Sequence, residues 1–265
     1  MTVRVYDTDN GTDYAELLKL NPMGTFPAVY PRRTVYGTPQ AVALGLDPVE
    51  ATPNVLLEPD QYVDAIAEAH EMQTLPMYHA RDTWRPKGFQ WNQDGIGYCW
   101  TWSGTGALMT CRAMESKDTV MLAPVSMGYL VGWADRGNYL ESFINGARED
   151  GVCPAVDGEY NSHNRSRSYW DQHDEDRSKY KLGKVWDTRS GAMTQHCLSI
   201  LKYGRPLYSA WNHMGHAMEV LAVRYVNGSL EWIISNSWNK RELFIMKGSK
   251  AVPDEAYGFV STKLA

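Results

Sequence analysis

The stretch Asn92-Gln93-Asp94-Gly95-Ile96-Gly97-Tyr98-Cys99-Trp100, followed by residues 101–114, decides the fold. The two glycines predict a tight turn, and the run that begins at Cys99 predicts a helix. A thiol at a helix N-terminus lies beside unpaired backbone N–H groups and the positive end of the helix dipole, and both favour the thiolate. Gln93, six residues earlier, can direct its amide to the place where an oxyanion would develop. The pattern therefore indicates nucleophilic catalysis by Cys99.

Two further motifs lie far downstream of this cysteine. Gly215-His216-Ala217 opens an alternating apolar stretch, and Asn236-Ser237-Trp238 closes the next one. Cysteine, histidine and asparagine in this order, each in its own element, form the arrangement that a Cys–His–Asn triad requires. Because a single cysteine on a helix is more often buried and inert, the hypothesis depends on the three motifs together.

At these motifs the chain resembles the papain-like cysteine peptidases, over about residues 75–250. The matching motifs are, in chain order, Leu75-Pro76, Asp82, Trp84-Arg85, Gly88, Gln93, Cys99-Trp100, His216-Ala217 and Asn236-Ser237-Trp238. The resemblance implies an α+β fold of two lobes, one helical and one rich in β-strands, with the site in the groove between them. It also implies hydrolysis of a peptide bond through a thioester, with no cofactor.

The resemblance assigns a role to each residue of the motifs. Cys99 is the nucleophile, His216 accepts the thiol proton and later protonates the leaving group, and Asn236 holds the imidazole in the useful tautomer. Gln93 joins the Cys99 backbone N–H as an oxyanion donor. The supporting residues are Trp100 and Trp238, and ordinary packing would bury Trp238 in the same way.

Alternatives stay open at neighbouring positions. His213 competes with His216 as the base, but Ala217 and the strand pattern that follows it fit the family better. Gly137 and Asn138 lie where relatives carry an edge that pairs with substrate backbone, and a plain loop is an equally good interpretation.

Composition narrows the classes of function. The chain of 265 residues is 43% hydrophobic and 22% charged, which is typical of a soluble globular protein. A net charge of −5 without a basic stripe gives nucleic-acid binding little support, and no apolar run approaches the length of a membrane span. His163 and His173 lack partners at metal-ligand spacing, so no metal site is predicted.

Cysteine usage bears on the compartment. Cys99, Cys111, Cys153 and Cys197 do not make a disulfide framework in a chain of this length. Cys111 lies about 120° around the helix from Cys99, which predicts a position in the core. Ile96 stands where secreted papain-like enzymes usually carry a bridging cysteine. With an acidic N-terminus that lacks an apolar segment, these features predict a cytoplasmic protein.

Residues 1–74 are expected to form an N-terminal extension, and residues 75–265 the papain-like domain. The helical lobe of that domain spans about residues 95–180 and the β-rich lobe about residues 181–265. Frequent prolines and glycines up to about residue 50 favour an irregular arm with short strands at most, without a helical prosegment. Helices are expected over residues 61–72, 138–149 and 192–201, strands over 53–57, 184–186, 205–211, 220–225, 230–235 and 243–246, and a hairpin turn at Asn227-Gly228.

Some features depart from the family. Only ten residues separate Pro206 from His216, and Tyr98 is bulkier than the small residue usual before the nucleophile. The compact form, Asn54-Val55-Leu56-Leu57 and residues 251–256 resemble papain-like proteins encoded in tailed-phage genomes. Two functions stay open. One is a cysteine endopeptidase acting on peptide or protein substrates, and the other is a virion-associated structural protein that keeps the fold and binds other virion proteins through residues 1–74.

Overall fold

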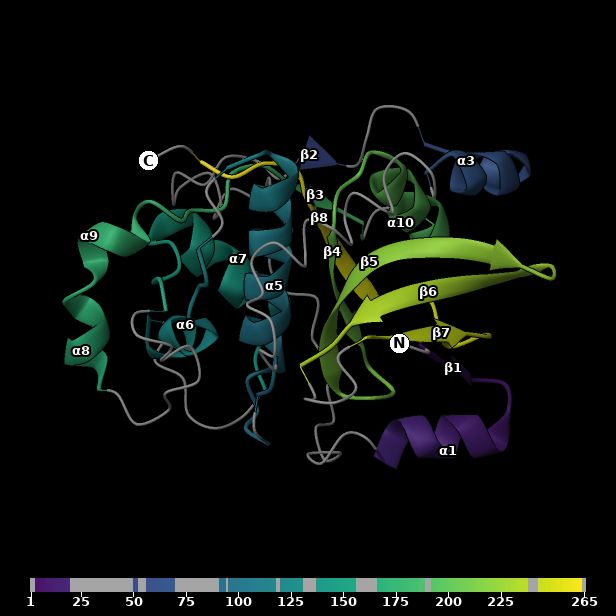
Figure 1. Cartoon of the computed structure of the whole chain (residues 1–265), viewed down its shortest axis with the longest axis horizontal. Coiled ribbons are helices and arrows are strands. Elements are labelled where there is room, and N and C mark those ends of the chain that lie inside the picture. Colours follow the sequence, from purple (N-terminus) through teal and green to yellow (C-terminus); the bar gives the residue numbers. More distant parts are fainter. Residues whose placement is uncertain are drawn as a thin grey trace.

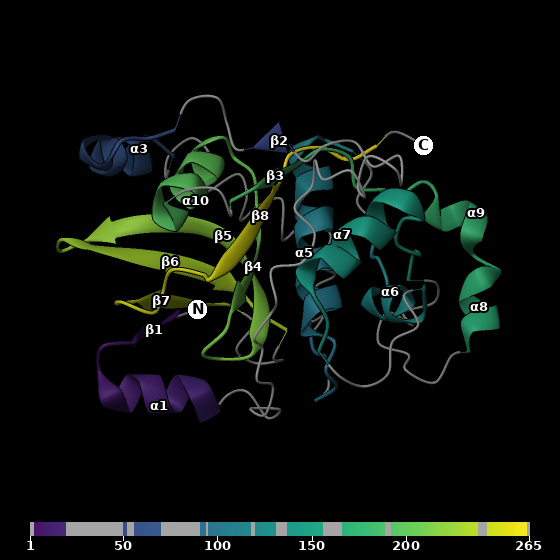
Figure 2. The same cartoon turned by 180° about the vertical axis from the view of Figure 1, so that it is seen from behind.

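The computed structural model describes residues 3–19, 50–51, 56–69, 91–93, 95–117, 120–130, 137–155, 166–188, 192–237 and 243–263. These residues form a helical lobe and a β-rich lobe that lie side by side (Figure 1). Figure 2 shows the same arrangement from behind, with helix α5 along the boundary between the lobes. The α+β architecture expected from the sequence is therefore confirmed.

Helix α5 (Cys99–Met114) is the centre of the helical lobe. Every residue from Cys99 to Arg112 is buried, as expected for a helix that is surrounded by protein on all sides. The helices around it are α6 (Pro124–Leu130), α7 (Leu140–Glu149), α8 (Arg167–Asp171) and α9 (Asp174–Arg177). Close packing against α7 requires Gly104, because a Cβ atom there would lie 2.5 Å from the Phe143 ring.

In the described part of the chain, one sheet of eight strands forms the β-rich lobe. In spatial order the strands are β1 (Arg4–Asp7), β7 (Leu243–Lys247), β6 (Ser229–Ser235), β5 (His216–Val226), β4 (Leu207–Trp211), β8 (Glu255–Phe259), β3 (Val185–Asp187) and β2 (Glu50–Ala51). Strands β5 and β6 form a hairpin in which Asn227 and Gly228 have φ angles of 49° and 79°. Two successive left-handed residues are what a type I′ turn needs, so the predicted hairpin turn is confirmed.

Side chains alternate between the two faces of the sheet along each strand, so each face can pack into a core of its own. Tyr208 and Ala217 face the helical lobe and share a core with α5, α6 and α7. Their neighbours Leu207 and Met218 point to the opposite face. That second core includes residues of α10 (Met193–Lys202), α3 (Tyr62–Ala69) and α1 (Gly11–Lys19), and the short 3₁₀ helix η1 (Pro59–Gln61) leads into α3. Strands β4 and β5 thus connect the two cores.

Most of the expected elements are present. Helices α3, α7 and α10 lie within one or two residues of the expected ranges or inside them, and β3, β4, β5, β6 and β7 overlap the expected strands. Strand β5 begins earlier than expected, at His216, and so carries the candidate base itself. Of the strand expected over residues 53–57, residues 56 and 57 are not in a strand and the others lie outside the described residues. Residues 70–90 are also outside them, so the domain boundary at residue 74 stays a prediction.

The N-terminal segment corrects the expectation of an irregular arm. Strand β1 pairs in parallel with β7 at the edge of the sheet, and helix α1 follows it. Asn10 begins the helix by accepting a hydrogen bond from the Thr12 N–H at 3.0 Å, and Leu17 is completely buried. A helix of nine residues is stabilised mainly by such burial, which a short sequence pattern does not reveal. Residues 20–49 of the expected arm lie outside the described residues.

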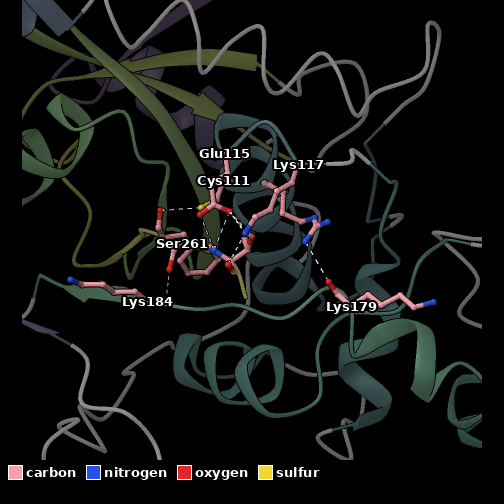
Figure 3. Close-up of polar contacts among 9 residues, drawn as sticks. Cys111, Glu115, Lys117, Lys179, Lys184 and Ser261 are labelled. Carbon is pink, nitrogen blue, oxygen red and sulfur yellow. Dashed lines mark hydrogen bonds and ion pairs between the residues drawn. The ribbon is translucent and has the colours of Figure 1, made fainter. Parts of the chain in front are cut away.

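The C-terminal segment is attached to the far end of α5 (Figure 3). The carboxylate of Glu115 accepts a hydrogen bond from the Thr262 N–H at 3.1 Å. Lys117 Nζ donates to the Thr262 carbonyl and hydroxyl oxygens, both at 2.8 Å, and lies 2.9 Å from Glu115. The Cys111 thiol donates to the carbonyl of Phe259, the last residue of β8, at 3.4 Å. These contacts join the C-terminal end of α5 to the β-rich lobe.

Candidate active site

Cys99 is the first residue of α5, at the boundary between the lobes. The turn before it closes when the Tyr98 N–H donates to the Ile96 carbonyl at 2.7 Å. The backbone N–H groups of Cys99 and Trp100, in the first turn of the helix, and of Ala217 on β5 point at the sulfur. Since Ala217 directly follows His216, the packing of α5 on β5 brings the thiol to the strand that carries the candidate base.

His216 and Asn236 are brought together by the pairing of β5 with β6. Asn236 follows the last residue of β6, and His216 is the first residue of β5. The two side chains meet with His216 Nε2 at 2.8 Å from Asn236 Oδ1, and both residues are 1% exposed. Asn236 Oδ1 also accepts the Ser237 N–H at 2.8 Å, which identifies it as the amide oxygen. His216 Nε2 therefore carries the hydrogen, and Nδ1 keeps the lone pair that a general base needs.

Gln93 is fixed between the two lobes by three hydrogen bonds. Its backbone N–H donates to the Ser237 carbonyl at 2.9 Å, and its side-chain oxygen accepts the Ser237 hydroxyl at 2.5 Å. Its Nε2 donates one hydrogen to the Ile96 carbonyl at 2.7 Å. This leaves the second Nε2 hydrogen for another acceptor. Sequence reasoning gave Ser237 no role of its own, although its place directly after Asn236 was a usable signal.

Burial shifts the pKa values of the thiol and the imidazole in opposite directions. It raises the pKa of Cys99 to about 11, while the three backbone N–H groups act against that rise. It lowers the pKa of His216 to about 4, and the hydrogen bond to Asn236 opposes that shift. Each charged form is disfavoured because it is removed from water. Both shifts favour the uncharged forms, so the resting state is a neutral thiol and a neutral imidazole.

Solved structures with the same fold come from cysteine proteases. They include the digestive procathepsin L 3 of Tenebrio molitor larval midgut, with a TM-score of 0.53 and 16% identity over 63% of this chain and 64% of that one. Xylellain, a cysteine protease from Xylella fastidiosa, has a TM-score of 0.51 and 17% identity over 68% of this chain and 85% of its own. The ragweed pollen protease Amb a 11, in its proform, has a TM-score of 0.53 and 13% identity over 65% of this chain and 62% of its own. The fold is that of the papain-like cysteine proteases.

The likeness to papain-like proteases is one of structure. No protein-family profile and no curated protein matches the chain. At identities between 13% and 17%, the match establishes the fold. The matched region also spans less than two thirds of the procathepsin and of the ragweed proform.

The remaining predicted residues of the papain-like site are placed as follows. Trp100 is fully buried, and its carbonyl accepts the Tyr208 hydroxyl at 2.8 Å, which ties the start of α5 to β4. Asn138 Oδ1 accepts the Tyr139 N–H at 2.8 Å, so this side chain is engaged at the start of α7, while Gly137 beside it is partly exposed. Substrate pairing at this edge stays a prediction. Trp238 and residues 75–88 lie outside the described residues.

His213 and Cys111 lie outside the contacts that form the site. His213 is in the turn before β5, where its ring lies 5.7 Å from that of Tyr14. Cys111 is fully buried, and burial raises its pKa to about 12, so the expected core position is confirmed.

The part of the chain that the structure describes shows neither a metal cluster nor a membrane span. No group of three or more His, Cys, Asp or Glu side chains in it converges to hold a metal ion. None of its helices is long and apolar enough to cross a bilayer. His163 falls outside this part, and His173 meets the Tyr169 ring edge to face, with 5.2 Å between the ring centres.

Proposed function

We propose that the protein is a cysteine endopeptidase that hydrolyses peptide bonds through a thioester intermediate. The observation that carries the proposal is the 2.8 Å hydrogen bond between His216 Nε2 and Asn236 Oδ1. Ala217, the residue after His216, directs its backbone N–H at the Cys99 sulfur. The bond to Asn236 leaves His216 Nδ1 as the proton acceptor. A neutral imidazole with a free Nδ1 is the form that a general base for a thiol requires.

In the first half of the reaction, His216 Nδ1 takes the proton of the Cys99 thiol as the sulfur attacks the peptide carbonyl carbon. The carbonyl oxygen becomes an oxyanion, which accepts hydrogen bonds from the Cys99 backbone N–H and the second hydrogen of Gln93 Nε2. The imidazolium then gives its proton to the leaving amine. The C–N bond breaks, and the acyl group remains on the sulfur as a thioester.

In the second half, water replaces the departed amine. His216 removes a proton from the water as the hydroxyl attacks the thioester carbonyl, and the same two donors bind the oxyanion. Collapse of this intermediate breaks the C–S bond and releases a carboxylic acid. The sulfur recovers a proton from the imidazolium, which restores the resting pair of thiol and neutral imidazole.

The geometry of Gln93 supports its part in this mechanism. Its amide is held from both ends, by the Ser237 hydroxyl and by the Ile96 carbonyl. A donor that is already oriented loses no free energy in reorganising when charge develops, so it stabilises the transition state more than a mobile one. Since Ser237 adjoins Asn236, one short segment orients both the oxyanion donor and the imidazole.

Labelling with a cysteine-directed epoxide tests the proposal. The native protein is treated with the epoxide, digested, and the modified cysteine identified by mass spectrometry. We expect modification at Cys99 and none at Cys111, Cys153 or Cys197, since these three are completely buried whereas Cys99 is 5% exposed. His216→Ala should abolish labelling, because no base then removes the thiol proton. His173→Ala, a matched change far from Cys99, should label as the wild type does.

Two results would refute the endopeptidase. One is a native protein in which Cys99 stays unmodified although it reacts after unfolding, and the other is equal labelling in the wild type and in His216→Ala. Either result would favour the alternative of a virion-associated protein that retains only the fold. That alternative, the likeness to tailed-phage proteins and the cytoplasmic or virion location stay predictions. Loss of particle association after deletion of residues 1–50 would support the virion role.

A further inference from the structure

A short turn, residues 211–215, decides where the histidine strand begins. It joins β4 to β5 and is closed by hydrogen bonds from the Met214 N–H to the Trp211 carbonyl at 3.2 Å and from the Gly215 N–H to the Asn212 carbonyl at 3.1 Å. Gly215, with a φ of 56°, has a left-handed conformation that suits glycine. His216 follows at once, so any shift of this turn moves the imidazole.

The turn is held from outside by the loop of residues 248–254. Trp211 Nε1 donates to the Ala251 carbonyl at 3.0 Å, and the Asn212 N–H donates to the Asp254 carboxylate at 2.7 Å. Both bonds end on a segment far along the chain. The position of the turn therefore depends on the position of this loop.

The loop is in turn held by the N-terminal segment. The Ser249 N–H donates to the carboxylate of Asp9 at 3.0 Å, and the Lys250 N–H donates to the Thr8 hydroxyl at 3.1 Å. The Ser249 hydroxyl also donates to the Asp9 carboxylate, and the hydrogen bonds from Ser249 lower the pKa of Asp9. A chain of hydrogen bonds thus leads from residues 8 and 9 through the loop to the turn.

Helix α1 also contacts the turn directly. The Tyr14 ring lies 5.7 Å from the His213 ring, and the Lys250 ammonium lies 4.3 Å from the centre of the Tyr14 ring. Among the described residues, His213 Nε2 has no hydrogen-bond partner, so at that nitrogen no hydrogen bond fixes the ring that Tyr14 contacts. Leu17, one turn further along α1, is fully buried in the core that includes Trp211 and Met214.

We propose that residues 3–19 are a positioning element of the catalytic site, in which Tyr14 and Asp9 hold the turn before His216 so that the imidazole meets Asn236 and the Cys99 thiol. The proposal rests on the proposed function, since it concerns the same histidine. Tyr14 and Asp9 contact none of the reacting groups and act through His213 and the loop. The N-terminal segment then contributes to turnover, although it lies on the outer edge of the β-rich lobe.

The expected size of the effect follows from geometry. A displacement of about 1 Å in a reacting group can lower a rate by about 100-fold, because proton transfer requires hydrogen-bonding distance and alignment. Substrate binding does not depend on the imidazole in this way. Weakening the support should therefore lower kcat far more than it changes KM.

The test compares Tyr14→Ala with Tyr14→Phe, which keeps the ring, and with Tyr225→Ala. Tyr225 lies near the far end of β5 and is 43% exposed, so its variant is a matched aromatic deletion on the strand of His216. Asp9→Asn provides a second, milder change at an exposed position. All four are made in the full chain, and thermal unfolding checks that each is folded. The readouts are kcat and KM on a peptide substrate and the pH titration of the His216 ring by NMR.

Tyr14→Ala should lower kcat at least about 10-fold with little change in KM, and Asp9→Asn should do so more weakly. Tyr14→Phe and Tyr225→Ala should both have the kcat of the wild type. In Tyr14→Ala the pKa of His216 should rise from its lowered value, because a displaced ring gains access to water. Asn236 binds the His216 ring, whereas Tyr14, Lys250 and Asp254 act on His213, so a direct charge effect of the substitution on His216 is not expected.

A His216 titration and a kcat that are unchanged in both Tyr14→Ala and Asp9→Asn would overturn the proposal. A loss in Tyr14→Phe equal to that in Tyr14→Ala would overturn the role of the ring contact. The NMR titration needs no enzymatic activity. If Cys99 in the wild type proves unreactive, the endopeptidase proposal fails, while the titration still decides whether residues 3–19 position His216.

Discussion

Helix α5 carries a cysteine near each end, and the two have opposite surroundings. Burial raises the pKa of both thiols, to about 11 at Cys99 and about 12 at Cys111. At Cys99 the groups that point at the sulfur are backbone N–H donors, which stabilise a thiolate. At Cys111 the thiol donates to the Phe259 carbonyl, the carboxylate of Glu115 raises the pKa further, and nearby arginine and lysine side chains act against that rise.

This comparison shows that burial alone does not distinguish a nucleophile from a core cysteine. The direction of the surrounding dipoles does, together with the presence of a base. The N-terminal end of α5 offers N–H groups and lies beside β5 with His216. The C-terminal end offers carbonyl groups and is bound to Lys117 and Thr262. We call the end at Cys99 the reactive end, after its proposed role, and the end at Cys111 the fixed end.

Replacement of each cysteine by alanine should separate the two ends most strongly. Cys99→Ala should lower kcat/KM by at least about 1,000-fold, because the covalent step is lost. Cys111→Ala should leave kcat/KM nearly unchanged and lower the free energy of unfolding by about 1 kcal/mol, through lost packing. Peptide hydrolysis and urea unfolding measure the two quantities. A large loss of activity in Cys111→Ala would show that the fixed end also takes part in catalysis.

Removal of the Gln93 amide should show whether the reactive end needs a donor besides the helix. Gln93→Ala should lower kcat by about 100-fold to 1,000-fold, as expected for an oxyanion donor, with little effect on KM. Gln195→Ala, on α10, is the matched control and should behave as the wild type. If Gln93→Ala raised KM and left kcat unchanged, the amide would bind the ground state and not the oxyanion.

The sequence predicted the strands that carry the candidate residues better than the elements that support them. Cys99, His216 and Asn236 were recognisable because each belongs to a short motif, and β5 and β6 were recognisable from alternation and the Asn227-Gly228 turn. The pairing of those strands then brings the side chains together. Short motifs with specific chemistry are thus readable before the fold is known.

The elements missed by the sequence depend on distant contacts. Helix α1 is short, and Leu17 is buried only because the sheet edge and the turn before β5 cover it. Strand β1 pairs with β7, more than 200 residues away, and no local pattern encodes a partner so distant. Ser237 was passed over because its role depends on where Gln93 lies. Prediction failed where burial or pairing, and not local preference, decides the structure.

Acid should weaken the reactive end through the buried imidazole of His216. Its pKa is about 4 in the folded protein, against an ordinary value of 6.5. As the pH falls, the unfolded chain therefore binds a proton first, so stability is complete above 6.5, declines toward pH 4 and changes no further below it. The loss attributable to His216 should reach about 3 kcal/mol, measured by urea unfolding across this range. His216→Asn should remove this part of the decline, whereas His173→Ala should keep it.

Loss of the Lys117 ammonium should loosen the fixed end of α5 and have the smallest effect. Lys117→Ala removes two hydrogen bonds to Thr262 and the ion pair with Glu115, in a site where both side chains are largely buried. We expect the free energy of unfolding to fall by about 1–2 kcal/mol, with kcat/KM nearly unchanged. Lys179→Ala, which removes an ion pair of two half-exposed side chains, should cost less than about 0.5 kcal/mol and serves as the control. A fall of kcat/KM in Lys117→Ala beyond about tenfold would show that movement at the fixed end reaches Cys99, because a rigid helix would transmit it along its axis.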